Sequence, residues 1–116
     1  MTGKFDKIVG IEMFEAVGLD RYDEFFSACD RLLTRDGAML LQLITLPDRE
    51  FTTYRKRVDW IQMYIFPGSE LASLAEIHQA LARSTRILLV QMENFGLHYA
   101  RTLARWRFFA NLKSVE

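Results

Sequence analysis

The sequence predicts an α/β fold, in which strands and helices alternate along one chain. Residues 7–14 (KIVGIEMF) form a nearly continuous apolar run, which suits a strand buried on both faces of a parallel sheet. Residues 38–46 (AMLLQLITL) repeat that pattern, and an amphipathic helix is predicted between the two runs. Strand, helix and strand in this order make a βαβ unit, whose crossover is almost always right-handed.

The helix between these strands is predicted to begin at Asp20, after Gly18 ends the first strand. Its apolar residues recur at spacings of three, four and seven, with charged residues on the other face. These apolar residues are Tyr22, Phe25, Phe26, Cys29, Leu32 and Leu33. Asp20 is the expected N-cap, because its carboxylate can accept a backbone N–H of the first turn. Asp36 and Gly37 are expected to end the helix, because glycine tolerates a positive φ.

The second half of the chain predicts two helices, a strand and a last helix. Pro47 and Asp48 open a helix whose apolar spacing continues to Pro67. Ser73 and Glu76 have the spacing of a capping box, which starts a short helix. A third strand at residues 86–90 (RILLV) and a helix over residues 98–112 follow. The predicted order is strand, helix, strand, helix, helix, strand, helix, in one unit over residues 1–116.

Composition indicates one globular domain with a real core, since half of the 116 residues are hydrophobic. Fifteen basic and fifteen acidic residues cancel, so no net field attracts the chain to nucleic acid or to an anionic membrane, and any lipid contact must be local. We expect a cytoplasmic protein, because no apolar run is long enough to span a bilayer and no signal-peptide pattern opens the sequence. The single cysteine, Cys29, is expected to be a small core residue.

Several motifs occur in the order that one enzyme family shows. Residues 5–18 (FDKIVGIEMFEAVG) resemble the FDxIVSxxMFExVG stretch of that family, residues 64–68 read YIFPG, and residues 98–106 fit HYAxTLxxW. Further matches lie between these motifs over nearly the whole chain. The sequence therefore resembles the cyclopropane-fatty-acyl-phospholipid synthases and mycolic acid cyclopropane synthases.

The resemblance implies a class I methyltransferase fold, which is a doubly wound, Rossmann-like sheet with a glycine-rich loop for S-adenosylmethionine in its first half. The chain corresponds to the C-terminal part of that sheet and starts at about its fourth strand. Its six glycines are scattered singly and form no GxGxxG-like turn between a strand and a helix. We therefore expect one partial, incomplete methyltransferase domain over residues 1–116, without the half that binds S-adenosylmethionine.

The implied reaction adds a methylene or methyl group from S-adenosylmethionine to unsaturated acyl chains of phospholipids. It requires a base in an apolar pocket, and the family is expected to hold a bound bicarbonate for this purpose. Glu15 matches the glutamate of the MFE motif, Tyr99 matches the tyrosine of HYA, and Gln42 stands where many members have a histidine. These three are the candidate catalytic residues. Ile11 and Met13 correspond to positions that line the cofactor pocket, and no metal site is expected.

Each candidate also has a purely structural interpretation. Glu15 could cap the following turn or pair with an arginine, and Tyr99 could be a packing residue with its hydroxyl at the surface. Gln42 could be a satisfied polar group within the core, and its departure from histidine weakens the bicarbonate interpretation.

The predicted helix after Pro47 raises two questions of its own. The run Arg55–Lys56–Arg57 could meet phospholipid head groups, but a solvated helix face is the favoured interpretation. Several aromatic residues could line an acyl pocket, although core packing is favoured. They are Phe51, Tyr54, Trp60, Tyr64 and Phe66.

Three alternatives remain open at the level of function. The methyl acceptor could be a small amine, because N-methyltransferases share the MFE and HYAxT motifs. The chain could also be a non-catalytic remnant, or a binding and assembly module that forms homo-oligomers through an exposed sheet edge. In the lipid interpretation, the protein would contact the inner face of the membrane peripherally.

Overall fold

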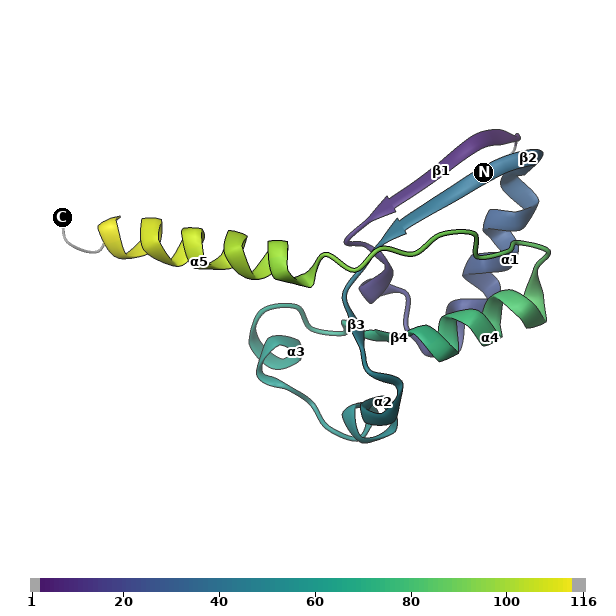
Figure 1. Cartoon of the computed structure of the whole chain (residues 1–116). Helices are drawn as coiled ribbons and strands as arrows, with labels where there is room; N and C mark the ends of the chain where they lie inside the picture. Colours follow the sequence, from purple (N-terminus) through teal and green to yellow (C-terminus); the bar gives the residue numbers. More distant parts are fainter. Residues whose placement is uncertain (1–2, 114–116) are drawn as a thin grey trace.

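A parallel βαβ unit opens the computed structural model, which describes residues 3–113. Strand β1 (Phe5–Ile11) leads through two short 3-10 helices, η1 (Phe14–Ala16) and η2 (Leu19–Arg21), into helix α1 (Tyr22–Leu32). Strand β2 (Leu33–Gln42) then returns to pair with β1 in parallel, with Ile8 opposite Met39 and Ile11 opposite Gln42 (Figure 1). The predicted strand, helix and strand are therefore confirmed.

The predicted limits of α1 were wrong at both ends. Asp20 lies inside η2, and the N-cap position belongs to Arg21, whose side chain makes no capping hydrogen bond. The helix passes directly into β2, so Asp36 and Gly37 lie within that strand. The pairing register shifts from Phe5–Leu33 to Lys7–Ala38, which places Asp36 and Gly37 in the irregular stretch of β2.

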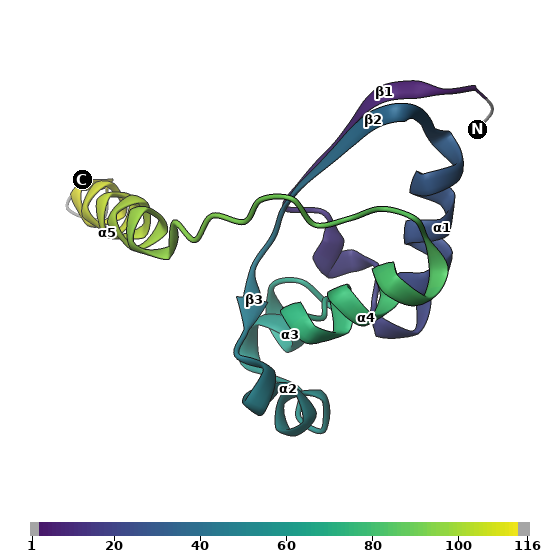
Figure 2. The ribbon, with the colours of Figure 1, turned by 45° about the vertical axis from the view of Figure 1, so that its right-hand side comes forward.

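Only one face of the β1–β2 pair is covered, so the prediction of strands buried on both faces was wrong. Met39 and Leu41 pack against the core, whereas Val9, Ile11 and Leu40 are exposed. Helices α1 and α4 (Leu74–Ser84) lie on the covered side (Figure 2). Among residues 3–113 no further strand or helix lies over the other face, which leaves its apolar side chains in solvent.

The predicted long helix after Pro47 is divided into two. Helix α2 (Asp48–Arg55) and helix α3 (Trp60–Tyr64) are separated by four residues, and Asp59 caps α3. The two-residue strand β3 (Thr45–Leu46) precedes these helices in the sequence, and β4 (Ala72–Ser73) follows them. The two strands pair in parallel. Helix α2 ends at Arg55, and Asp59 starts α3, because its extended backbone, with ψ of 171°, lets its carboxylate accept the Gln62 N–H.

The third strand predicted at residues 86–90 is not formed. Residues 86–95 have no regular structure, and Leu88 and Val90 are 80% and 93% exposed. A strand exists only where its backbone groups find a neighbouring strand, and within residues 3–113 none pairs with this segment. An apolar run is therefore insufficient evidence for a strand here.

The last predicted helix is confirmed as α5 (Gly96–Lys113). It projects away from the other elements in both views (Figures 1 and 2). The radius of gyration is 17.0 Å, compared with about 13 Å for a compact domain of this length. The helices that the structure describes include none with the length and apolar character needed to cross a membrane.

The buried core is small and mainly aromatic. Phe14, Tyr22 and Phe26 are at most 1% exposed, and the Phe14 ring lies 4.6 Å from the ring of Tyr22 and 5.4 Å from that of Phe26. The helix face predicted to be apolar supplies Tyr22, Phe26 and Cys29 to it. Cys29 is a buried core residue as predicted, and burial raises the pKa of its thiol.

Gly18 separates η1 from η2 with φ of +77°. A side chain at this φ strains the backbone, so we expect Gly18→Ala to lower the free energy of unfolding by about 1–2 kcal/mol. Urea unfolding followed by far-UV circular dichroism measures this. Gly96→Ala is the control, because Gly96 lies at the start of α5 without a positive φ. An equal loss in both variants would contradict the assigned strain.

Asp48 joins the beginnings of α2 and α4. Its Oδ1 atom accepts hydrogen bonds from the Ala75 N–H at 3.0 Å and the Ser73 hydroxyl at 2.7 Å. The Ser73 hydroxyl in turn accepts the Glu76 N–H at 3.3 Å, as its predicted capping role requires. The Ala75 N–H, followed by the Ser73 hydroxyl, holds the pKa of Asp48 below its usual value.

A depressed carboxylate pKa stabilises the fold above the pKa of the unfolded chain, about 3.9, and this stabilisation is lost as pH falls through the folded value. We therefore expect Asp48→Asn to be less stable than the parent chain near neutral pH. The difference should shrink as the pH is lowered below 4, roughly the usual aspartate range. Thermal melts over this pH range test it, and a gap that stays constant with pH would contradict the role of the ionised carboxylate.

Candidate functional site

The carboxyl ends of β1 and β2 bring the polar candidates to one edge of the sheet. Because the strands are parallel and Ile11 pairs with Gln42, both strands end at the same level. The Glu12 N–H extends this pairing by donating to the Gln42 carbonyl at 2.8 Å. Ligands of open α/β sheets bind outside this edge, so this is the candidate site.

Glu15 is buried at this edge, with 8% of its surface exposed. Its Oε1 atom accepts the Ile44 N–H at 2.7 Å, and its main-chain carbonyl accepts the Glu70 N–H at 2.8 Å. One glutamate thus joins η1 to the chain after β2 and to the chain before β4. Phe14, its neighbour in η1, is held in the aromatic core, which fixes where Glu15 lies.

The second carboxylate oxygen of Glu15, Oε2, is buried and has no hydrogen-bond partner within the described part of the chain. A buried acceptor without a donor is costly, and such atoms are rare in folded proteins. Beyond the structural pairing considered from the sequence, Glu15 thus has one buried oxygen that no donor among these residues satisfies.

Gln42 lies at the end of β2 and is half-buried. Its Nε2 atom donates to Glu12 Oε1 at 2.9 Å. Glu12 itself has φ of +51°, the only positive φ at a non-glycine residue in the range described. Backbone strain of this kind is frequent at functional sites. The sequence did not identify Glu12, because no local pattern predicts a positive φ at a glutamate.

Tyr99 is not joined to this edge. It belongs to α5, is 38% exposed, and makes no hydrogen bond to Glu15 or Gln42 in the structure described for residues 3–113. A catalytic role for Tyr99 beside Glu15 stays a prediction. Glu15 and Gln42 share one edge of the sheet, whereas Tyr99 lies on the helix that projects from the body.

Ile11 and Met13 present apolar surface at the carboxyl end of β1, where they are 59% and 42% exposed. A Cβ atom at Gly10 would lie 3.3 Å from Met13 Sδ, so the Met13 side chain covers the backbone of Gly10 closely. This surface can contact an apolar or aromatic group of a ligand. The assignment of both residues to a cofactor pocket stays a prediction.

These residues fit the rim of an S-adenosylmethionine site rather than a whole one. Apolar surface is present, but the positive φ values in the range described belong to Gly3, Glu12, Gly18 and Gly68, and no glycine-rich turn joins a strand to a helix there. Bicarbonate and Glu15 match in chemistry, since a bicarbonate hydroxyl is a donor and the carboxylate is an acceptor.

A second group of buried polar atoms lies behind Glu15. The Tyr22 hydroxyl is buried without a hydrogen-bond partner among the described residues, and burial, followed by the charge of Glu70, raises its pKa. Arg55 approaches Glu70 at 3.2 Å and balances that carboxylate. This group lies at the junction between α1, α2 and the chain before β4.

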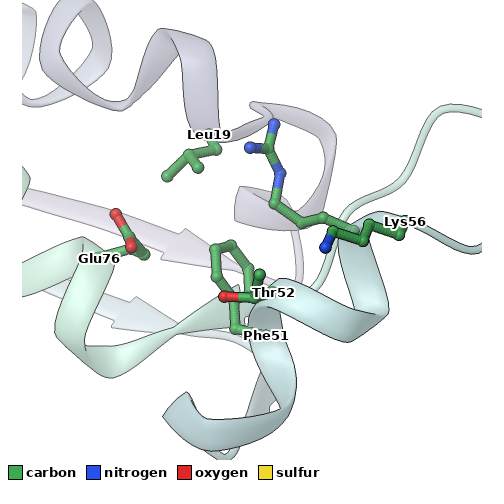
Figure 3. A pocket seen from close by; sticks show the side chains of 6 residues that line it. Leu19, Phe51, Thr52, Lys56 and Glu76 are labelled. Atoms are coloured by element: carbon green, nitrogen blue, oxygen red, sulfur yellow. The ribbon is translucent and has the colours of Figure 1, made fainter.

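An open pocket of about 340 Å³ lies between η2, α2 and α4. Phe51 and Leu19 form its apolar part, and Glu76 and Lys56 lie at its sides (Figure 3). A second hollow follows one face of α5, from Arg101 to Arg105. Neither contains Glu15, Gln42 or Tyr99, so the candidate site is defined by its buried carboxylate and not by an enclosed cavity.

Comparisons with known proteins identify the family of this chain. The family model described as mycolic acid cyclopropane synthetase matches residues 1–115. The tuberculostearic acid methyltransferase UfaA1 of Mycobacterium tuberculosis is 36% identical over 92% of this chain and 25% of its own length. The cyclopropane-fatty-acyl-phospholipid synthase of Escherichia coli K12 is also 36% identical, over 95% of this chain and 28% of its own length.

Solved structures give the same result for the fold. The mycolic acid cyclopropane synthase CmaA1, crystallised with SAH and CTAB, superposes with a TM-score of 0.78 at 34% identity, over 91% of this chain and 40% of its own. The cyclopropane synthase MmaA2 from Mycobacterium tuberculosis superposes with a TM-score of 0.75 at 27% identity. The predicted fold class, part of a Rossmann-like methyltransferase sheet, is confirmed. The chain spans about a quarter of the length of the two curated relatives.

Proposed function

Because this chain belongs to the mycolic acid cyclopropane synthetase family, we propose that it forms the acceptor side of an S-adenosylmethionine-dependent lipid C-methyltransferase. The substrate would be an unsaturated acyl chain of a phospholipid, to which a methylene or methyl group is added, at the inner face of the membrane. The observation that carries this proposal is the buried Glu15 carboxylate at the carboxyl end of two parallel strands, with one oxygen unpaired.

Each residue at the edge would have a distinct part in this reaction. S-adenosylmethionine, when bound, supplies an electrophilic methyl group. Ile11 and Met13 would provide apolar contacts that keep water from the reacting carbons. A proton must leave the methylated acyl chain before a ring closes, so a base is required. That base would be a bound bicarbonate. The free Glu15 oxygen would position it by accepting a hydrogen bond from its hydroxyl group.

Gln42 and Tyr99 would complete the surroundings of this base. The Gln42 amide nitrogen is engaged by Glu12, so that its amide orientation is fixed relative to Glu15. The Tyr99 phenol can donate to an anion, which requires α5 to approach the sheet edge.

A hybrid enzyme tests this proposal directly. In it, the chain replaces the region that it matches in the Escherichia coli relative. With radiolabelled S-adenosylmethionine, we expect label in unsaturated phospholipid and none in small amines. Circular dichroism shows whether the hybrid folds. A folded hybrid that labels amines, or that labels nothing, would refute the lipid proposal.

The exposed surface of the chain favours a second candidate, a binding and assembly module. The uncovered face of β1–β2 carries Val9, Ile11 and Leu40, and an open strand edge invites pairing with another chain. Light scattering of the purified chain tests this candidate, for which dimers or larger species are expected. The hybrid assay separates the two candidates, because a module without a catalytic role would give a folded hybrid that labels no lipid. Calorimetry with S-adenosylmethionine tests a premise of both, since micromolar binding by the isolated chain would contradict the expected lack of the cofactor half.

A further inference from the structure

The chain from Trp60 to Phe66 (WIQMYIF) presents its apolar side chains outward. Its six apolar residues are between 51% and 65% exposed, and Gln62 is the one residue turned inward. The order is thus the reverse of an ordinary surface helix, whose polar residues face solvent. The prediction that Trp60, Tyr64 and Phe66 pack in the core was therefore wrong for the part of the chain that the structure describes. Phe51 alone of that aromatic group is fully buried.

Hydrogen bonds hold this segment in place. Asp59 Oδ1 accepts the Gln62 N–H at 2.7 Å, and Gln62 Oε1 accepts the Asp59 N–H at 3.0 Å, which completes a capping box. Gln62 Nε2 donates to the Ser69 carbonyl at 2.7 Å. The inward glutamine fixes the helix at both ends, so the outward apolar surface belongs to an ordered structure.

Positive charge adjoins the apolar surface. Arg55 faces Glu70 at 3.2 Å and Asp20 at 3.8 Å. Lys56 and Arg57, the next two residues, are exposed and form no ion pair within residues 3–113. The rings of Trp60 and Tyr64 lie 5.8 Å apart. Helices α2 and α3 lie together at the end of the molecule opposite the β1–β2 pair in both views (Figures 1 and 2).

We propose that this α3 surface, formed by Trp60–Phe66 with Lys56 and Arg57, docks on the interface of an anionic phospholipid bilayer. Tryptophan and tyrosine prefer the depth of the lipid head groups, aliphatic side chains insert beside them, and basic residues attract lipid phosphates. The inference rests on the proposed function, because docking would bring the enzyme to its acyl substrate.

The other exposed apolar surfaces fit a bilayer less well. The β1–β2 face carries open backbone edges, which favour strand pairing over lipid contact. On α5 the exposed apolar residues Leu97, Leu103 and Phe109 lie on different sides of the helix. Within residues 3–113, the α3 surface has no open strand edge, and it combines one-sided apolar exposure with two adjacent cations, Lys56 and Arg57, that form no ion pair.

Binding of the purified chain to vesicles tests the inference without cofactor or turnover. We expect cosedimentation with vesicles of phosphatidylglycerol and phosphatidylcholine in equal parts, and weaker binding to phosphatidylcholine alone. Removing two cations in K56Q/R57Q should weaken binding about 25-fold, at about fivefold for each charge. Trp60→Ala with Phe66→Ala should weaken it by more than about tenfold. In a Trp106→Phe background, Trp60 fluorescence should shift to shorter wavelength on binding.

The control variants remove the same number of cations or of exposed apolar side chains at sites outside the α3 surface. R105Q/R107Q removes two cations from α5, and Leu88→Ala with Val90→Ala removes exposed apolar groups from residues 86–95. Both should bind like the parent chain. Absence of binding to anionic vesicles, or loss of binding only in the α5 variant, overturns the proposal. So does α3-dependent dimerisation without vesicle binding, seen by light scattering. Methyl transfer to detergent-dispersed lipid by the hybrid enzyme tests the proposed function separately.

Discussion

Replacing Phe26 with alanine is expected to lower the free energy of unfolding by about 3–5 kcal/mol. The Phe26 side chain is 0% exposed, and its ring lies 5.3 Å from that of Phe25 and 5.4 Å from that of Phe14. Its removal leaves a cavity between α1 and η1 that the surrounding rings cannot fill. Domains of this size are stable by only about 5–15 kcal/mol, so a large share of the stability should be lost. Urea unfolding followed by circular dichroism measures the change.

Phe109→Ala is the matched control, because Phe109 is 60% exposed on α5. The same truncation there should change the unfolding free energy by no more than about 0.5 kcal/mol. Similar losses in both variants would contradict the conclusion that Phe14, Tyr22 and Phe26 form the core. That result would also contradict the argument that the core fixes the position of Glu15 through its neighbour Phe14.

The βαβ unit could be predicted from sequence because two different periodicities follow each other in it. The 3.6-residue pattern of α1 places Tyr22, Phe26 and Cys29 on its buried face, as the structure has it. Burial of both strand faces could not be predicted correctly, because an apolar run does not reveal which elements cover it. The same limit explains residues 86–90, where a strand-like sequence has no neighbouring strand to pair with.

Helix ends depended on hydrogen bonds that a local pattern only partly encodes. The capping role of Ser73 follows from its spacing to Glu76, but its second bond, to Asp48, joins residues 25 positions apart. The division at Asp59 was missed, because the apolar spacing continues through it. The extent of α5 was predicted closely, whereas its projection from the body was not, because its apolar residues suggested packing.

The candidate site shows the same division between local and distant information. The sequence places Glu15 directly after a strand predicted over residues 7–14, whereas the structure ends β1 at Ile11 and has Glu15 in η1, beyond the carboxyl end of that strand. Its bond to the Ile44 N–H joins residues 29 positions apart, and like its unpaired oxygen it depends on where the chain leads after β2. Likewise, Gln42 meets Glu12 across 30 residues. Such contacts between distant residues cannot be read from a local sequence pattern, and the role of the unpaired Glu15 oxygen stays a prediction.

Glu15→Gln separates these two roles with little change in shape. The amide oxygen can still accept the Ile44 N–H, so the fold should persist with a loss of about 1 kcal/mol from the weaker neutral hydrogen bond. The other oxygen is replaced by an NH₂ group, which cannot accept a hydrogen bond from the hydroxyl group of the bicarbonate. We therefore expect methyl transfer to lipid by the hybrid enzyme to fall by roughly 100-fold or more, the contribution of a positioned base.

Glu12→Gln is the control at the same edge. Its amide oxygen can still accept the Gln42 N–H, and Glu12 is exposed, so activity should change by less than about fivefold. A folded Glu15→Gln hybrid with parental activity would show that Glu15 only joins η1 to the chain after β2. Equal losses of activity in both variants would show that methyl transfer depends on the total charge at this edge of the sheet and not on the unpaired oxygen of Glu15. Because only the Glu15 carboxylate is buried, a large difference between the two variants is the result that the structure predicts.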